Sequence, residues 1–167
     1  FDVHQDKAPL GRVVFELAAD VVPRTCHNFM RLVEGRTEKE GVQGYTGTNF
    51  HVVAKNNVIM GGDVENHDGT GNHSSYGHRY IADENFIIPH SDKGLLSMAS
   101  IGRDTGASQF YIGLNSGDKN RHLNGRCVVF GRVVAGEDTL DKVNELFTTR
   151  LKPVHPVTIA ACGVLEA

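Results

Sequence analysis

The chain of 167 residues is predicted to be mostly β, with strands closing into a barrel that is capped by two helices. Seven or eight apolar segments, separated by turn-forming residues, give the pattern of an antiparallel barrel. Nineteen glycines and no tryptophan favour many turns over long helices. The length suits a single domain over residues 1–167, able to bury roughly 70% of the surface of its unfolded chain.

A hairpin is predicted at the N-terminus. Phe1–Gln5 and Arg12–Leu17 have the composition of strands, and the turn between them, Asp6–Gly11, contains proline and glycine. Both residues suit the backbone dihedral angles of a turn. We therefore expect two antiparallel strands joined by this segment.

The first helix is predicted over residues 22–33. Its apolar residues recur three and four positions apart, which places them on one helical face. Asp20 is a candidate N-cap, and Pro23 suits the first turn. The polar, glycine-rich segment 34–44 that follows is expected to be a solvated loop.

A second hairpin is predicted over residues 50–64, with two apolar runs separated by Lys55, Asn56 and Asn57. The next segment, 65–85, is dense in glycine, histidine, asparagine and serine. A long irregular loop of this kind is typical of a functional segment or of a covering flap.

The rest of the chain alternates strands with one more helix. The expected strands are Leu95–Ala99, Gln109–Leu114, Cys127–Val134 and Val157–Cys162. The second helix is predicted over residues 137–147, from the spacing of Leu140, Val143, Leu146 and Phe147. The predicted core includes Phe29, Phe50, Met98, Phe110, Val129 and Phe130.

The charge and the cysteine content limit the kinds of partner and the cellular location that we expect for this chain. The net charge of −3 and the scattered basic residues argue against binding to nucleic acid. No apolar run approaches the ~20 residues that cross a bilayer, so we expect no membrane association. Cys26, Cys127 and Cys162 are odd in number and have no paired spacing, which predicts free thiols and a reducing, cytoplasmic location. The chain opens directly on a predicted strand, so a leader or a further domain could lie outside it.

The order of motifs along the chain is specific. They are PLGRVVFEL, VPRTCHNF, GYTGTNFH, GGD, GTG, DENF, GLLSMA, GASQFYI, LNGRCVVFGRVVAG and TIAACGVLE. In this order, from Phe1 to about Glu166, they resemble the cyclophilins, a family of peptidyl-prolyl cis-trans isomerases. The resemblance implies an eight-stranded antiparallel barrel with a helix at each end and a proline-binding groove on its outer face. It implies no cofactor, and we expect a monomer.

On the hairpin at residues 50–64, the residues at the implied groove positions differ from those of active cyclophilins. Active cyclophilins show Phe-His-Arg where this chain has Phe50, His51 and Val52, so the catalytic arginine is replaced by valine. A Phe-Met-x-Gln pattern is expected where this chain has Asn57, Val58, Ile59 and Met60. A thioether accepts hydrogen bonds only weakly, so Met60 cannot replace a glutamine amide.

The opposite wall of the groove is better preserved. The family pattern has an Ala-Asn pair where this chain has Ala99 and Ser100. It has Gln-Phe-Phe where this chain has Gln109, Phe110 and Tyr111. A Trp-Leu pair followed by His is expected where this chain has His122, Leu123 and Cys127. The full set of implied groove positions is Val52, Asn57, Val58, Met60, Ala99, Ser100, Gln109, Tyr111, His122, Leu123 and Cys127, and we expect no intact catalytic residue and no metal site.

Prolyl isomerisation moves no proton, so its catalyst needs a pocket for proline, a backbone anchor and a donor that favours the twisted amide. The rotation barrier is about 18–20 kcal/mol, and removing a preorganised donor typically costs on the order of 10²–10³ in rate. We therefore expect a binding or scaffolding module for a proline-containing peptide or protein surface, with weak or no isomerase activity. Weak or no binding of cyclosporin, which family members commonly hold in this groove, is also expected.

Several alternatives stay open at the level of sequence. The chain could be an active isomerase or foldase with an atypical site, in which Lys55 or Arg103 supplies the missing donor. Lysine lacks the planar fork of a guanidinium, which weighs against it. Cys127 could be a nucleophile, although cysteine in an apolar strand is usually a small buried hydrophobe. The histidines at 67, 73 and 78 could bind metal, but their spacing is not typical of zinc sites. The GGD and GTG glycines are interpreted as turn and close-packing residues.

Overall fold

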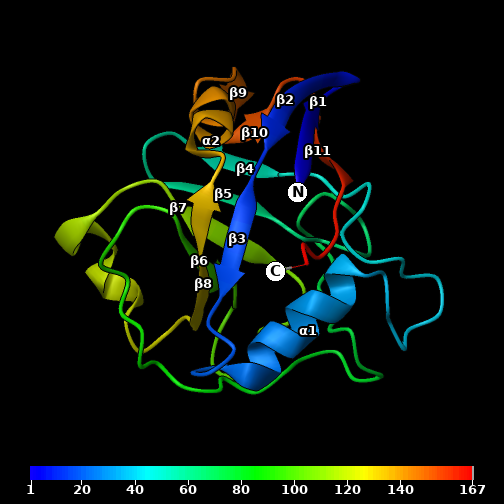
Figure 1. The fold of residues 1–167 in the computed structure, drawn as a ribbon, viewed down its shortest axis with the longest axis vertical. Coiled ribbons are helices and arrows are strands. Elements are labelled where there is room, and N and C mark those ends of the chain that lie inside the picture. The colour runs from blue at the N-terminus through cyan, green and yellow to red at the C-terminus, as the bar shows by residue number, and fades with distance from the viewer. Residues whose placement is uncertain (167) are drawn as a thin grey trace.

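The computed structural model, which describes residues 1–166, is mostly β and contains three helices (Figure 1). The strands are β1 (Asp2–Gln5), β2 (Ala8–Arg12), β3 (Val14–Leu17), β4 (Val52–Ala54), β5 (Val58–Gly61), β6 (Leu95–Met98), β7 (Phe110–Gly113), β8 (Val129–Ala135), β9 (Thr148–Thr149), β10 (Lys152–Pro153) and β11 (Val157–Ala161). The helices are α1 (Pro23–Val33), the 3₁₀ helix η1 (Gly117–Leu123) and α2 (Glu137–Asn144).

All strand pairs are antiparallel, and they form three sheets. Six strands pair in the order β3-β8-β6-β7-β5-β4, three in the order β11-β1-β2, and β9 pairs with β10 alone. The chain passes from β2 into β3 through Val13, and an isolated bridge between Asn49 and Thr158 joins the segment before β4 to β11.

The closed eight-stranded barrel is not confirmed, because no ladder in the described residues runs around a full circle. At Val13, whose backbone N–H and carbonyl bond to Phe1, the chain passes from the three-stranded sheet to the six-stranded sheet, and β2 and β3 belong to separate ladders. On the far side, an isolated bridge and backbone hydrogen bonds join residues 47–50, which precede β4, to β11 in place of a ladder between two strands.

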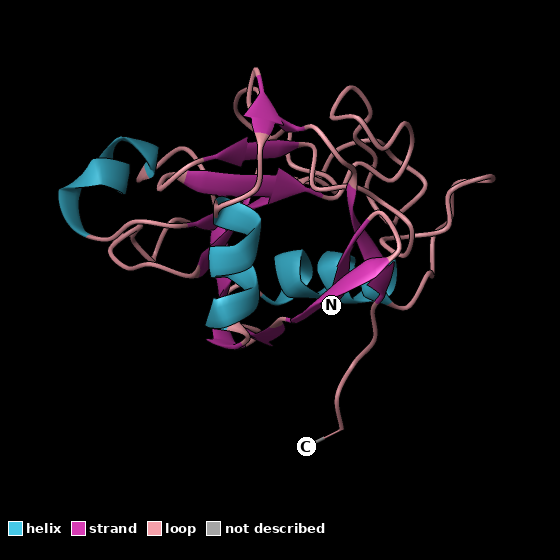
Figure 2. Ribbon diagram, turned by 90° about the horizontal axis from the view of Figure 1, so that it is seen from above, coloured by secondary structure: helices cyan, strands magenta, loops and turns pink. Residues whose placement is uncertain are grey.

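The two α-helices lie at opposite ends of the strands (Figure 1). Helix α1 starts at Pro23, as predicted, but Asp20 does not cap it: the N-cap position is Val22, which provides no side-chain bond. Glu84 supplies the cap from a distant loop, its carboxylate accepting the backbone N–H of Thr25 at 2.9 Å. The third helix, η1, was not predicted, and it lies at the periphery of the molecule (Figure 2).

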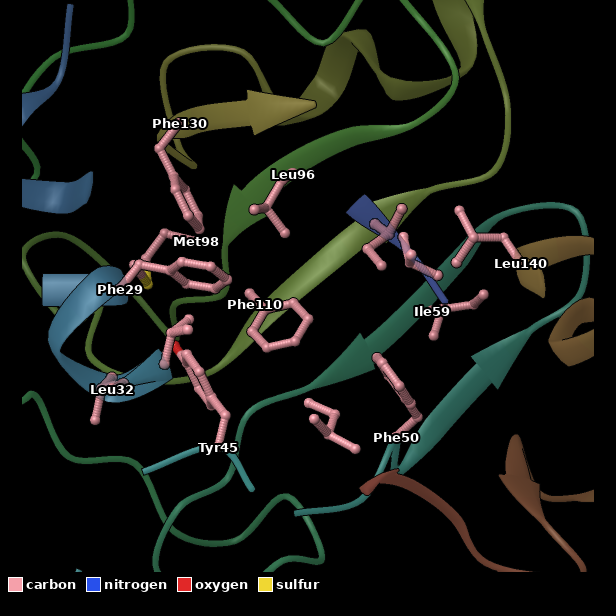
Figure 3. Packing of buried hydrophobic residues seen from close by; sticks show 14 of the residues in the cluster. Phe29, Leu32, Tyr45, Phe50, Ile59, Leu96, Met98, Phe110, Phe130 and Leu140 are labelled. Atoms are coloured by element: carbon pink, nitrogen blue, oxygen red, sulfur yellow. The ribbon is translucent and has the colours of Figure 1, made fainter. Parts of the chain in front are cut away.

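One cluster of buried side chains fills the space between the sheets and the α-helices. Figure 3 shows Phe29 and Leu32 of α1, Phe110 of β7 and Leu140 of α2 converging in it. All six predicted core residues are confirmed as buried: Phe29, Phe50, Met98, Phe110, Val129 and Phe130.

Three local predictions are wrong. The first hairpin turns at Asp6 and Lys7, because Gln5 pairs with Ala8, so Pro9 and Gly11 belong to β2. Strand β8 starts at Val129, which leaves Cys127 half-buried outside it. Helix α2 ends at Asn144.

Phe147 therefore lies beyond the predicted second helix and is 83% exposed. Of the apolar residues that predicted this helix, Leu140 and Val143 are buried on its inner face. The three cysteines are free, as predicted.

Candidate functional site

The outer face of the six-stranded sheet carries the central groove positions. Val52 of β4 pairs with Met60 of β5, Met60 with Tyr111 of β7, and Tyr111 with Ser97 of β6. Directly paired antiparallel residues point to the same face, so these four side chains form one row across the sheet.

The neighbouring row points into the core. Val53, Ile59, Ile112 and Leu96 are paired in the same way, and all are fully buried. Because strand residues alternate between faces, burial of this row fixes the opposite orientation of Val52 and Met60. The register therefore places the substituted positions on the face away from the core.

His90 contacts two side chains of this row, and the sequence did not single it out. Its Nε2 is 2.8 Å from the Tyr111 hydroxyl and 3.0 Å from the Ser97 hydroxyl. The Asn124 Oδ1 accepts the His90 backbone N–H at 2.8 Å and lies 3.0 Å from Nδ1. Since Oδ1 is an acceptor, Nδ1 carries the proton and Nε2 accepts from a hydroxyl.

Burial lowers the pKa of His90, which favours this neutral ring. Burial likewise raises the pKa of Tyr111, so its hydroxyl keeps its proton. The network thus uses the hydroxyls of Ser97 and Tyr111 internally. Little in the sequence indicated this hydrogen-bond network, because a histidine, a serine and an asparagine spread over residues 90–124 have no recognisable spacing.

Gln109, a retained groove position, is bonded to a loop of its own chain. Its Nε2 donates to the Gly69 carbonyl at 3.0 Å and also to the Gly71 carbonyl. Its side chain is mostly buried. Both N–H groups of this amide are therefore occupied before any peptide arrives.

Asp63 holds that loop in place. Its carboxylate accepts backbone N–H groups from Glu65, Asn66, Asp68, Gly69 and Gly71 at 2.9–3.2 Å. Burial alone would raise the pKa of Asp63, but these donors lower it below its ordinary value. The glycines pack closely, as the GGD and GTG interpretation required: a Cβ on Gly71 would lie 2.5 Å from Asp63 Oδ1.

His51 is buried next to the same loop. A Cβ on Gly69 would lie 2.5 Å from its Cδ2 atom. Burial is the main reason that the pKa of His51 is lowered. The imidazole therefore packs beneath the loop as a neutral ring.

The wall next to Gln109 contains one retained position, Ala99, and two substituted positions, Ser100 and Cys127. The Ala99 backbone N–H donates to the Gln109 carbonyl at 3.0 Å, which joins the ends of β6 and β7. Ser100 Oγ lies 4.0 Å from Cys127 Sγ, and the Cys127 thiol also contributes to the raised pKa of Tyr111.

Helix η1 forms the margin of the groove. The Leu123 carbonyl accepts the Cys127 backbone N–H at 3.1 Å, so Leu123 is placed beside the wall. His122 is exposed, and its Nδ1 lies 3.1 Å from the Lys119 carbonyl within the same helix. The hydrogen bond of the His122 side chain thus stays within its own helix and does not connect it to the other implied groove positions.

The turn between β4 and β5 carries the other end of the groove. Asn57 is exposed, and its Oδ1 accepts from Asn115 Nδ2 at 3.2 Å. Val58 is half-buried and pairs with Gly113 of β7. A polar amide and a small β-branched side chain thus stand where the resemblance implies a phenylalanine and a methionine.

The implied groove positions offer few free hydrogen-bond donors. Val52 has none, Met60 has only a weak acceptor, and the hydroxyl of Tyr111 bonds to His90. Lys55 and Arg103 are exposed on loops, and neither side chain forms a hydrogen bond or an ion pair within residues 1–166. The row therefore presents apolar side chains at Val52 and Met60 and provides no positioned guanidinium.

The three loop histidines have separate contacts. His73 is buried with its Nδ1 2.9 Å from the Ser74 carbonyl, His78 stacks on Tyr76, and the His67 carbonyl accepts from Asn49. Within the described part of the chain, no group of three or more metal-binding side chains is gathered. None of the helices between residues 1 and 166 has the length and hydropathy to cross a membrane.

A hollow of about 880 Å³ lies along α1, outside the groove. Phe15, Phe29, Met30 and Val164 are among the apolar residues that line it. None of the implied groove positions does so.

A comparison with family models agrees with the fold and with the motif order. The model described as cyclophilin type peptidyl-prolyl cis-trans isomerase/CLD matches residues 1–164, nearly the whole chain. The chain belongs to the cyclophilin-type peptidyl-prolyl cis-trans isomerase family.

Proposed function

We propose that this chain is a cyclophilin domain that binds a proline-containing peptide or protein surface and has weak or no isomerase activity. Residues 1–167 act as one domain and as a monomer, and the two larger sheets together serve as the closed barrel of the family. The site needs no metal or cofactor.

The observation that carries the proposal is the row formed by Val52, Met60 and Tyr111. A catalyst must donate to the amide as its resonance is lost, and the position that the family pattern gives to arginine holds an isopropyl group. Gln109 cannot compensate without breaking its bonds to Gly69 and Gly71. The loss of a preorganised donor alone costs about 3–4 kcal/mol in the barrier.

Binding is supported by what the groove keeps. Ala99, Gln109 and Leu123 match the family pattern, and Tyr111 replaces a phenylalanine with a ring of similar size. Apolar side chains at Val52 and Met60 on one sheet face, with the Ala99–Ser100 segment nearby on the same sheet, suit an extended peptide.

The rival function is an active isomerase with an atypical site, in which Arg103 or Lys55 reaches the substrate from its loop. The two functions differ in one property, turnover. Both predict that a peptide occupies the same groove.

Titration with a short Ala-Pro peptide, followed by amide and methyl NMR, tests the proposal. We expect shifts at Met60, Ala99, Tyr111 and Leu123, and cis-trans exchange of the peptide no faster than in buffer. Met60→Glu, which places a charge in the apolar row, should abolish the shifts, whereas Val134→Ser on an exposed part of β8 should not. Shifts that avoid the row would refute binding there, and fast exchange would favour the rival.

A further inference from the structure

The hairpin formed by β9 and β10 exposes three large apolar side chains. Phe147, Leu151 and Val154 are 83%, 53% and 54% exposed. They occur within eight consecutive residues, outside the groove described above. A cluster of this kind on a soluble surface is typical of a site of interaction.

The ladder of the hairpin places these side chains on one face. The Val154 backbone N–H donates to the Phe147 carbonyl at 2.9 Å, and Lys152 pairs with Thr149. Opposite residues in an antiparallel pair share a face, and so do residues two apart on one strand. Phe147, Thr149, Lys152 and Val154, together with the turn residues Arg150 and Leu151, form what we call the hairpin face.

The turn of this hairpin is strained. Arg150 and Leu151 have φ angles of 51° and 67°, the left-handed values that two-residue hairpin turns require and that Asn-Gly meets at least cost. The backbone has a structural reason for this shape, because the Leu151 carbonyl accepts the Val53 N–H of β4 at 2.7 Å. Glycine would make the same bond without strain.

The isobutyl group of Leu151 is therefore unfavourable twice, through its backbone angle and through its exposure. The contact with β4 uses the Leu151 backbone carbonyl, which any residue would supply, while the residue itself is 53% exposed. Strain and apolar exposure at one position indicate a role outside the fold.

Charge indicates the chemistry of the partner. Residues 147–155 contain Arg150 and Lys152 but no carboxylate, in a chain whose net charge is −3. Neither cation forms an ion pair in the part of the chain that the structure describes, whereas His155 lies 3.4 Å from Asp6. The hairpin face is thus apolar with two unpaired cations.

We propose that the hairpin face docks an acidic, extended segment of another protein. Apolar side chains of that segment pack on Phe147, Leu151 and Val154, and its carboxylates pair with Arg150 and Lys152. This interaction surface is separate from the peptide groove and does not depend on it.

Two other occupants fit less well. A second copy of the chain, packed face to face, would bring Arg150 and Lys152 against their own equivalents, which repel. A membrane would favour a protruding tip, but the turn is held against β4: the Leu151 carbonyl accepts the Val53 N–H, and β10 contacts β4.

The test uses two labelled peptides, each with a phenylalanine and a leucine in an extended, proline-free sequence, flanked by glutamates in one and by lysines in the other. We expect the glutamate peptide to shift the NMR signals of residues 147–154 and to bind at least about tenfold more tightly than the lysine peptide. Arg150→Glu with Lys152→Glu should reverse this preference.

Variants of the apolar residues separate binding from folding. Leu151→Gly removes the side chain and relieves the left-handed strain, so it should raise the melting temperature. The double variant Leu151→Gly with Phe147→Ser should bind the glutamate peptide about tenfold more weakly than the wild type. Val134→Ser, a matched change at another exposed apolar residue, should leave the affinity unchanged, and so should Met60→Glu in the groove.

Four results would overturn the proposal: equal affinity for both peptides, shifts confined to the groove, dimerisation in sedimentation that Phe147→Ser abolishes, or binding to vesicles of phosphatidylserine that the same variants weaken. The last two would assign the face to a second copy or to a membrane. Failure of the Ala-Pro peptide to bind would refute the proposed groove function and leave this one intact.

Discussion

The hydroxyl of Tyr111 lies 2.8 Å from Nε2 of His90, which connects the outer wall of the groove to a buried imidazole. His90 is bonded in turn to Asn124, the residue that follows helix η1. A phenylalanine, which the family pattern carries at the Tyr111 position, could not make this bond. Tyr111 of β7 is therefore joined to the end of η1 by side-chain hydrogen bonds through His90.

Tyr111→Phe should reduce the free energy of unfolding by about 1 kcal/mol. The Ser97 hydroxyl, 3.0 Å from Nε2, can still donate to His90, which keeps the loss small. Chemical denaturation measures this change in the free energy of unfolding. Tyr80→Phe serves as the control, because the Tyr80 hydroxyl makes no hydrogen bond within the described residues. Equal stability of the Tyr111 variant and the wild type would show that the bond contributes nothing.

Glu84→Gln should weaken the N-terminus of helix α1. The Glu84 carboxylate accepts the N–H groups of Arg24 and Thr25 at 3.0 and 2.9 Å, and these donors lower its pKa although burial opposes them. Loss of an N-cap costs about 1 kcal/mol, and the amide should retain part of that. Glu84→Ala should show the full loss in thermal unfolding. Asp20→Ala should leave the melting temperature unchanged. A loss of stability for Asp20→Ala larger than that for Glu84→Ala would contradict the assignment of the cap.

Stability should fall as the pH is lowered from 7.5 to 5. Burial lowers the pKa values of His51 and His90 below 6.5 in the folded protein, so the unfolded chain takes up protons first. The free energy of unfolding then decreases below pH about 6.5, with a limiting slope of about 1.4 kcal/mol per pH unit for each histidine. Denaturation at several pH values measures this slope, which His90→Gln should reduce. A flat profile would mean that neither imidazole is held neutral.

Cyclosporin should bind poorly or not at all. Val52 and Met60 present no donors to the carbonyls of the drug, the amide of Gln109 is bonded to Gly69 and Gly71, and His122 is exposed on η1. Each missing hydrogen bond to a desolvated carbonyl costs about 1–3 kcal/mol. Isothermal calorimetry measures the affinity. Nanomolar binding would show that the groove keeps the recognition surface of the family.

Apolar periodicity predicted the strands and the core because burial on one face imposes it. Val53, Ile59 and Phe110 are buried where the alternation requires, and the turn at Lys55–Asn57 lies where the turn formers are. The identity of the groove came from a family pattern and not from periodicity, since Val52 alone is an ordinary strand residue.

Long-range contacts could not be predicted in this way. The cap of α1 comes from Glu84, about sixty residues after the helix start, and His90 meets Tyr111 across two strands. Phe147 continues the helical spacing of Leu140 and Val143, but spacing does not show where a helix ends. The exposed hairpin that begins there is therefore visible only in the structure.

The central claim is that the groove has lost catalysis through several positions that act together. In the proposed function, Val52 supplies no donor, and Asn57 and Met60 lack the aromatic ring and the amide that the family pattern gives to the pocket and to the backbone anchor. Because such effects are not additive, we do not sum them. Val52→Arg alone should not restore activity, since its guanidinium would face a peptide that is not held.

The most direct measurement is the cis-trans exchange of a short Ala-Pro peptide by NMR, with wild type, Val52→Arg and the triple variant Val52→Arg, Asn57→Phe and Met60→Gln at equal concentration. We expect exchange at the rate in buffer for the first two proteins and measurable acceleration for the triple variant. Wild-type exchange at the rate of an active cyclophilin measured alongside would contradict the account and identify the chain as a working isomerase.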